Sequence, residues 1–261
     1  MKKGVKTAIV ICLTAVLVIG LVWIVRYYAG LKHDEDTMAE VQETAKPVET
    51  EPAAETGTSV AAIADLASVQ EKNSDVVAWI KWTGEGSVID YPVCQSTPDE
   101  GEDYYLDHDI EKADSISGAI YMQQVDAPDF SDYITVLYGH NMRNGSMFKG
   151  LHNFYDQTYF DNEENRTFLV QTADKLLTYK VYAAVRFGND LIPGKYNDTV
   201  PEARSQFLSD IAACRDMTSH IDTSMNVTEE DKLLVMSTCV ANTHDYRYVV
   251  VAVLQDEEPL S

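Results

Sequence analysis

The sequence predicts a mainly β domain that is held outside a membrane by a single N-terminal helix. Three observations lead to this prediction: a long run without charge near the N-terminus, an acidic segment after it, and a series of short runs rich in Val, Ile, Tyr and Phe from residue 78 onward. Such runs, bounded by Gly, Asn, Asp and Pro, are typical of the strands of a barrel or a sandwich.

The apolar run covers Thr7–Val25, 19 residues without a charged side chain, which is long enough to cross a bilayer as a helix. A cleaved signal peptide is the competing interpretation, but its apolar region is usually about 7 to 15 residues long and ends in a small-residue site. Tyr27–Gly30 is a poor version of such a site. Because the basic residues lie mainly before the run, a retained anchor leaves the N-terminus in the cytoplasm. We therefore expect residues 1–30 to be a cytoplasmic tip and a transmembrane anchor.

The acidic segment covers residues 31–57, which include eight acids and two prolines but almost no large apolar side chains. A segment of this composition cannot bury enough surface to offset the entropy lost on ordering, so we expect a disordered linker. Residues 58–261 then form one extracellular domain. The whole chain has a formal net charge of −22. Such a surface repels nucleic acid and anionic lipid head groups, which excludes both as partners.

Eight runs of the extracellular domain are predicted to be strands. They are Ala78–Trp82, Val88–Gln95, Gly118–Met122, Tyr133–His140, Arg166–Gln171, Lys175–Phe187, Lys232–Cys239 and Arg247–Leu254.

Helical segments are predicted at three places in the same domain. Apolar residues at helical spacing indicate a packed helix that begins near Thr58 and includes Val60, Ile63, Leu66 and Val69. A short helix is expected at residues 145–154. A longer one is expected at residues 200–217, where Pro201 lies just inside the start of the helix.

Cysteine is the best candidate for a nucleophile in this sequence. Cys12 lies in the apolar run, Cys94 lies within an alternating strand, and Cys214 lies on the apolar face of the longer helix, so all three are expected to pack. Cys239 is instead the last residue of a predicted strand and follows Ser237 and Thr238. At a strand end a thiol can be exposed. No Cys and His residues have the spacing of a zinc site, so we expect no metal and no cofactor.

A catalytic cysteine needs a proton carrier within hydrogen-bond reach and a group that stabilises charge on the substrate. His33, His108, His152 and His220 lie in the linker, in loops or in the short helix, where a lone histidine is usually a surface residue without a functional role. His140 and His244 remain. His140 ends a strand and His244 lies only five residues after Cys239; the spacing favours His140 and leaves His244 open.

Arg247 begins the last predicted strand, eight residues after Cys239. A surface salt bridge is the simplest interpretation in so acidic a domain. However, a strand, loop and strand arrangement can place the guanidinium opposite the thiol, where it can donate two hydrogen bonds to a developing oxyanion.

These residues and their order resemble the sortases, the membrane-anchored cysteine transpeptidases of Gram-positive bacteria, and specifically class B. The resemblance covers nearly the whole extracellular domain. The matching stretches are NSDVVAWIKW, VIDYPVCQ, DYYLDHD, GAIYM, YGHNMRNGSMFKGL and STC followed by Arg247.

The resemblance implies a closed eight-stranded sortase-type β-barrel with an N-terminal helix and a long helix between the sixth and seventh strands. It also implies that His140, Cys239 and Arg247 are catalytic and that His244 is not. In the family mechanism, the cysteine attacks a C-terminal sorting motif of a surface protein or a pilin and forms a thioester. An amine, such as that of the lipid II cross-bridge or of a pilin subunit, then takes the acyl group.

Two features leave the sorting motif undefined. Val-Met-Ser precedes the Thr238–Cys239 pair where Thr-Leu-Ser is commoner, and Val240 stands where some class B members have an acid. Ser237 is a candidate substrate-binding residue, although core packing explains its position equally well.

Three alternatives to a sortase are consistent with an external thiol. A cell-wall cysteine endopeptidase usually has its cysteine before its histidine, and an L,D-transpeptidase has a histidine and glycine block close to the cysteine. Here His140 precedes Cys239 by 99 residues, which fits neither class well. The third alternative is an inactive membrane-anchored scaffold domain.

Overall fold

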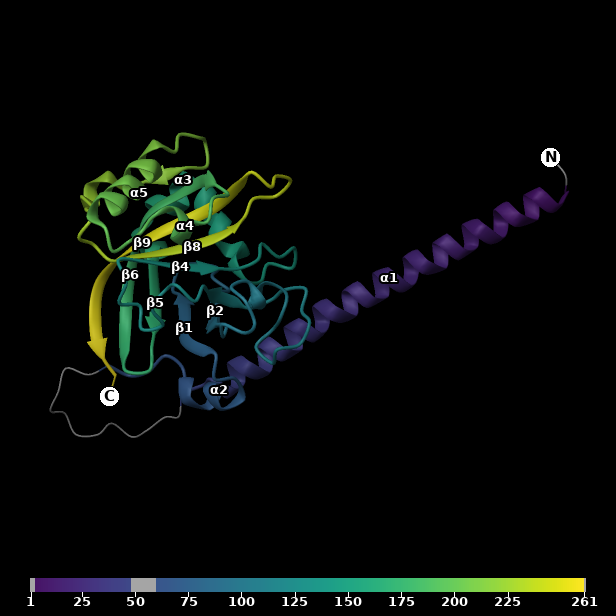
Figure 1. The fold of residues 1–261 in the computed structure, drawn as a ribbon, viewed down its shortest axis with the longest axis horizontal. Coiled ribbons are helices and arrows are strands. Elements are labelled where there is room, and N and C mark those ends of the chain that lie inside the picture. Colours follow the sequence, from purple (N-terminus) through teal and green to yellow (C-terminus); the bar gives the residue numbers. More distant parts are fainter. Residues whose placement is uncertain (1–2, 48–59, 261) are drawn as a thin grey trace.

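The computed structural model describes residues 3–47 and 60–260, and its main element is a closed β-barrel (Figure 1). Nine strands form one sheet: β1 Val76–Trp82, β2 Asp90–Gln95, β3 Ile120–Met122, β4 Ile134–Tyr138, β5 Thr167–Gln171, β6 Lys175–Gly188, β7 His220–Ile221, β8 Leu233–Cys239 and β9 Tyr246–Pro259.

Eight of these strands close the barrel. Their order is β5-β1-β2-β3-β4-β8-β9-β6, and pairing between β5 and β6 joins the two ends. Neighbours are antiparallel except for the pairs β2–β3 and β4–β8, which are parallel. All eight predicted strands are therefore present. The ninth, β7, pairs only with β6, through Ala183 and Ala184, and the sequence analysis missed it because two residues show no periodicity.

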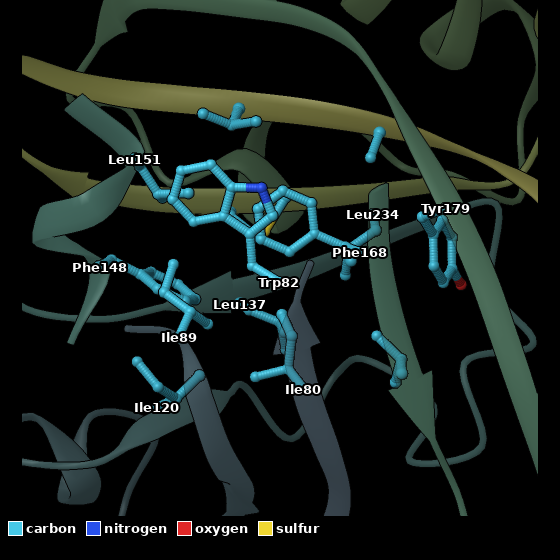
Figure 2. Packing of buried hydrophobic residues seen from close by; sticks show 14 of the residues in the cluster. Ile80, Trp82, Ile89, Ile120, Leu137, Phe148, Leu151, Phe168, Tyr179 and Leu234 are labelled. Carbon is cyan, nitrogen blue, oxygen red and sulfur yellow. The ribbon is translucent and has the colours of Figure 1, made fainter. Parts of the chain in front are cut away.

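The barrel is filled by apolar side chains from alternate positions of its strands (Figure 2). Trp82 of β1 stacks on Phe168 of β5 with ring centroids 5.3 Å apart, and its indole nitrogen donates a hydrogen bond to the carbonyl of Asn165. In β8, Leu234 belongs to this interior cluster. Neighbouring β8 residues belong to a second cluster, which the helix α5 covers. Strands buried on both faces explain why β8 reads as a continuous apolar run.

Helices cover the barrel at two of the places predicted for them. The α2 helix covers Leu66–Lys72 and the α5 helix covers Pro201–Ala213, in the connection between the sixth and seventh barrel strands, β6 and β8. The short helices are α3 Gln157–Asp161 and α4 Ile192–Lys195, and the 3₁₀ turns are η1 Tyr104–Leu106, η2 Phe148–Tyr155, η3 Glu163–Arg166 and η4 Thr223–Met225.

The first of these helices begins later than predicted. The Asp65 carboxylate accepts a hydrogen bond from the backbone N–H of Ser68, which caps the N-terminus of α2. Val60 instead pairs with Leu260 as an extended residue, and Ile63 precedes the cap. The predicted start at Thr58 lies outside the described residues.

The α1 helix covers Lys3–Thr44 and extends well beyond the apolar run. Residues 31–44, predicted as part of a disordered linker, are therefore helical, while residues 48–57 lie outside the described part of the chain. Asp34, Thr37 and Val41 are at most 8% exposed, and their spacing places them on one face of the helix.

That face packs on the barrel domain. The Asp34 carboxylate accepts a hydrogen bond from the backbone N–H of Ser117 at 2.9 Å, and the amide of Gln42 donates to the carbonyl of Asp90. The remaining acids of this segment point to solvent. Composition alone predicted disorder because it does not record that the few apolar and bonded residues share one face.

Candidate active site

The candidate site lies where β4 and β8 end and β9 begins, at one edge of the barrel. Cys239 is the last residue of β8 and is paired in register with Arg247 of the antiparallel strand β9. The parallel strand β4 lies on the other side of β8, where Tyr138 pairs with Ser237. His140, two residues beyond Tyr138, therefore lies beside the strand end that carries Cys239.

Gly139 allows the chain to pass close to the core just before His140. A Cβ atom at Gly139 would lie 2.8 Å from the ring of Phe148 and closer still to the side chain of Ile120, so a larger residue would displace this segment. The backbone N–H of Gly139 donates to the carbonyl of Ser237, which extends the parallel ladder by one hydrogen bond beyond the strand.

The His140 imidazole is oriented by the η1 turn. Its Nε2 lies 2.7 Å from the carbonyl oxygen of Leu106, and because a carbonyl only accepts, Nε2 carries the proton and donates it. In the neutral ring, Nδ1 is then the acceptor nitrogen. This hydrogen bond fixes the orientation of the ring, in the way that a second group commonly orients a catalytic base.

A cavity of about 190 Å³ brings the predicted residues together: His140, Ser237, Cys239 and Arg247 all line it. Cys239 is exposed, whereas Ser237 is only 4% exposed. Leu106 and Leu191 add apolar surface at the rim, where both remain largely exposed. The arrangement offers a thiol, a proton carrier and a cation to one bound molecule.

Two stacked tyrosines form another wall of this cavity. The rings of Tyr121 and Tyr138 lie 5.4 Å apart, and the Tyr121 hydroxyl donates to the Asp103 carboxylate at 3.1 Å. Burial raises the pKa of both phenols, so both stay protonated donors at neutral pH. The buried Tyr138 hydroxyl has no hydrogen-bond partner among the described residues.

The structure separates the other candidates from the site. His244 is exposed in the loop between β8 and β9, does not line the cavity, and its carbonyl accepts a hydrogen bond from Asn189. Cys94 is fully buried in β2. Cys214, expected on the apolar face of the long helix, caps its C-terminus and is partly buried. Among residues 3–47 and 60–260, no three His, Cys, Asp or Glu side chains are grouped as metal ligands.

Other cavity residues were not singled out from the sequence. Leu106, Asp103 and Tyr138 lie in sequence stretches that resemble the sortases, but no individual role was assigned to these three residues from the sequence. Their positions in the cavity depend on how η1 packs against the end of β4. Asn141 follows the histidine, and its side-chain amide donates to the carbonyl of Cys239 at 2.9 Å. No spacing rule links two residues 98 positions apart, so this contact is visible only in three dimensions.

Comparison with known proteins identifies the family. Residues 86–255, more than half of the chain, match the model of the sortase domain. The chain belongs to the sortase family. A curated relative, sortase B of Listeria monocytogenes serovar 1/2a, is 26% identical over 208 residues, which are 80% of this chain and 78% of that protein.

Solved sortase structures share the fold. Sortase B of Clostridium perfringens is 25% identical with a TM-score of 0.62, and the match covers 73% of this sortase and 99% of that chain. A Staphylococcus aureus sortase B–substrate complex is 26% identical with a TM-score of 0.59, covering 73% of this sortase and 84% of that chain. These relatives confirm the predicted class B resemblance and barrel, and this sortase is accordingly a cysteine transpeptidase.

Proposed function

We propose that this sortase cleaves a C-terminal sorting motif of surface proteins or pilins, retains the acyl part as a thioester on Cys239, and transfers it to an amine. The acceptor is an amine of a cell-wall precursor or of a pilin subunit. The observation that supports the proposal most directly is the single cavity lined by His140, Cys239 and Arg247. The similarity to a sortase B that has been crystallised with substrate adds to it.

In the first half-reaction, the Cys239 thiol gives its proton to Nδ1 of His140, and the resulting thiolate attacks the carbonyl carbon of the scissile peptide bond. A carbon–sulfur bond forms, and the negative charge that develops on the carbonyl oxygen is stabilised by the guanidinium of Arg247, a residue that pairs with Cys239 across the β8–β9 ladder. The carbon–nitrogen bond then breaks, and His140 gives its proton to the leaving amine. The Leu106 carbonyl, which accepts from Nε2, keeps the ring oriented during this transfer.

In the second half-reaction, the acceptor amine attacks the thioester. His140 takes a proton from that amine, a new amide bond forms and the Cys239 thiolate leaves. Ser237, at the buried end of the cavity, is proposed to contact the sorting peptide.

We also propose that α1 is a retained membrane anchor with a cytoplasmic N-terminus, followed by an extracellular catalytic domain. The helix contains the one segment in the described residues that is long and apolar enough to cross a membrane. Residues that precede it are basic. Cleavage as a signal peptide is the alternative, and the apparent mass of the protein in membranes distinguishes the two.

The test is incubation of the full chain, in detergent, with a panel of sorting peptides and with candidate amines. The full chain is used because α1 packs on the barrel as far as Ala45. We expect mass spectrometry to detect an acyl adduct on Cys239. The identity of the amine that accepts this acyl group then distinguishes wall anchoring from pilus assembly. If no peptide is cleaved, or if cleavage survives in Cys239→Ala, the proposal is wrong.

A further inference from the structure

The parallel ladder between β4 and β8 continues past the end of β4 through a side chain. Its last backbone rung joins the N–H of Gly139 to the carbonyl of Ser237 at 3.2 Å. In a regular parallel ladder, the next N–H of this strand to donate would be that of Asn141, two residues on, to the carbonyl of Cys239. Instead, the side-chain Nδ2 of Asn141 donates to that carbonyl at 2.9 Å.

The backbone cannot make this rung because it turns away at His140. The carbonyl of His140 accepts a hydrogen bond from the N–H of Phe148, and Asn141 pairs with Met147 across a tight loop. Gly145 and Met147 both have positive φ in that loop. The turn is what directs the His140 side chain toward the η1 carbonyl rather than along the strand.

We propose that Asn141 is a positioning residue, which replaces the missing rung and fixes the Cys239 end of β8 against the loop that carries His140. This inference rests on the proposed roles of Cys239 and His140. Its second effect is electrostatic: the Asn141 amide donates to the Cys239 carbonyl, whose negative end lies beside the thiolate of the same residue.

The two effects predict a change in chemistry rather than in peptide binding. Asn141 is not among the residues that line the cavity, so its loss leaves the sorting-peptide contacts in place. Without its amide, the strand end is tied less firmly to the histidine loop and thiolate formation becomes less favourable. A carboxylate at position 141 adds a negative charge and cannot donate, so it acts in the same direction more strongly.

The experiment compares Asn141→Asp and Asn141→Leu with Asn144→Asp in the full chain. Asn144 is a matched control: it lies in the same loop, is exposed, and its amide donates to Glu35 instead of Cys239. The first readout is the pH midpoint of iodoacetamide alkylation of the Cys239-containing peptide, measured by mass spectrometry. The second is the separate change in kcat and KM for the best sorting peptide.

We expect Asn141→Asp to raise the alkylation midpoint by about one pH unit and to lower kcat at least about tenfold with KM within about twofold. Asn141→Leu is expected to lower kcat in the same way with a smaller shift of the midpoint. Asn144→Asp should match the parent protein in both readouts. Circular dichroism establishes that each variant is folded, and the leucine variant serves if the aspartate variant is not.

A midpoint in both Asn141 variants equal to that of the parent, or a rise in KM with unchanged kcat, overturns the inference. An equal shift in Asn144→Asp overturns it as well, because a general charge effect of the loop then accounts for the result. Alkylation is measured without substrate, so an unchanged alkylation midpoint speaks only against the role of Asn141. A failure of the proposed function would instead be revealed by peptide cleavage in the Cys239→Ala variant.

Discussion

Arg247 lies directly across the β8–β9 ladder from Cys239, so backbone geometry fixes its position relative to the thiol. If its planar guanidinium donates to the oxyanion, a lysine, which presents one ammonium group, is a poor substitute. We expect Arg247→Lys to lower kcat by about 10- to 100-fold with a smaller change in KM, measured on a sorting peptide. Arg215→Lys, at an exposed position after α5, is the control. Activity of Arg247→Lys close to that of the parent would exclude the oxyanion role.

Asp126 is a buried carboxyl close to the end of β3 and is 5% exposed. Burial raises the pKa of Asp126 to about 8, and the carboxylates of Asp132 and Asp198 act in the same direction. Between about pH 4, where the unfolded chain loses this proton, and about pH 8, the folded state holds more protons. The free energy of unfolding contributed by Asp126 therefore falls as the pH rises through this window.

Asp126→Asn removes this titration and keeps an oxygen that can accept from the N–H of Val136. Relative to the parent, we expect the variant to gain on the order of 4 kcal/mol of stability between pH 5 and pH 8.5. Urea unfolding at both pH values of a shortened form, residues 27–261, which lacks the apolar run Thr7–Val25, measures the difference. Asp129→Asn, at an exposed acid in the next turn, should show no such gain. A pH-independent difference between Asp126→Asn and the parent would contradict the expectation.

At the level of residues, the sequence alone identified the candidate catalytic side chains but not the residues that orient them. Cys239 and Arg247 are recognisable because each lies at a strand boundary, and His140 because it ends another strand. The groups that orient them come from elsewhere: Leu106 is 34 positions from His140, and Asn141 is 98 positions from Cys239. Side chains that act through such contacts leave no periodic pattern in the sequence.

The carboxyl-terminal part of α1 shows why an element can be misread from composition. Its acids dominate the count, yet Val41 is 1% exposed and Asp34 is bonded to the domain. A helix needs only one apolar face, so a segment with few apolar residues can still dock when they are spaced at three and four. For α2, by contrast, the apolar spacing correctly predicted a helix. Only its start differs from the prediction, because Asp65 caps the N-terminus and the helix begins at Leu66.

The docking of α1 predicts a stability effect at Val41. An aspartate there would bury an unpaired charge against the barrel domain, and we expect Val41→Asp to lower the free energy of unfolding by about 3 kcal/mol. Ala39→Asp places the same charge on the exposed face of the same helix and is expected to stay within about 0.5 kcal/mol of the parent. Thermal and urea unfolding of the shortened form, residues 27–261, compares them. Equal effects would mean that the helix does not pack in solution.

For the whole molecule, the eight strands were predictable from β-branched and aromatic runs, and all are present. Their order around the barrel was not, because β1 pairs with β5 and β4 pairs with β8 across long intervening segments. The resemblance to the sortases supplied the closure that periodicity could not. Neither the sequence pattern nor the resemblance to the sortases predicted the ninth strand, β7, or the helical structure of residues 31–44.

The continuity of α1 also predicts how the whole molecule responds to a break in the helix. Inserting six Gly and Ser residues between Ala29 and Gly30 leaves the docked face intact but uncouples it from the membrane segment. We expect unchanged cleavage of a soluble peptide and at least about threefold slower transfer to a lipid-linked amine in vesicles. An insertion after Asn242, in the exposed loop between β8 and β9, would instead alter both reactions. If the insertion between Ala29 and Gly30 changes neither peptide cleavage nor transfer to the lipid-linked amine, α1 does not set the position of the domain relative to the membrane.

A continuous α1 also gives this enzyme a fixed reach. Asp34, the first residue to be bonded to the domain, lies nine positions after Val25, the last of the apolar run. At about 1.5 Å per residue this is roughly 13 Å. Figure 1 shows β8 and its connection to β9 on the side of the barrel toward which α1 leaves. If α1 anchors the enzyme as proposed, a protein substrate must present its sorting motif within a thin layer above the lipid. This limits how many residues can separate that motif from the substrate's own membrane segment.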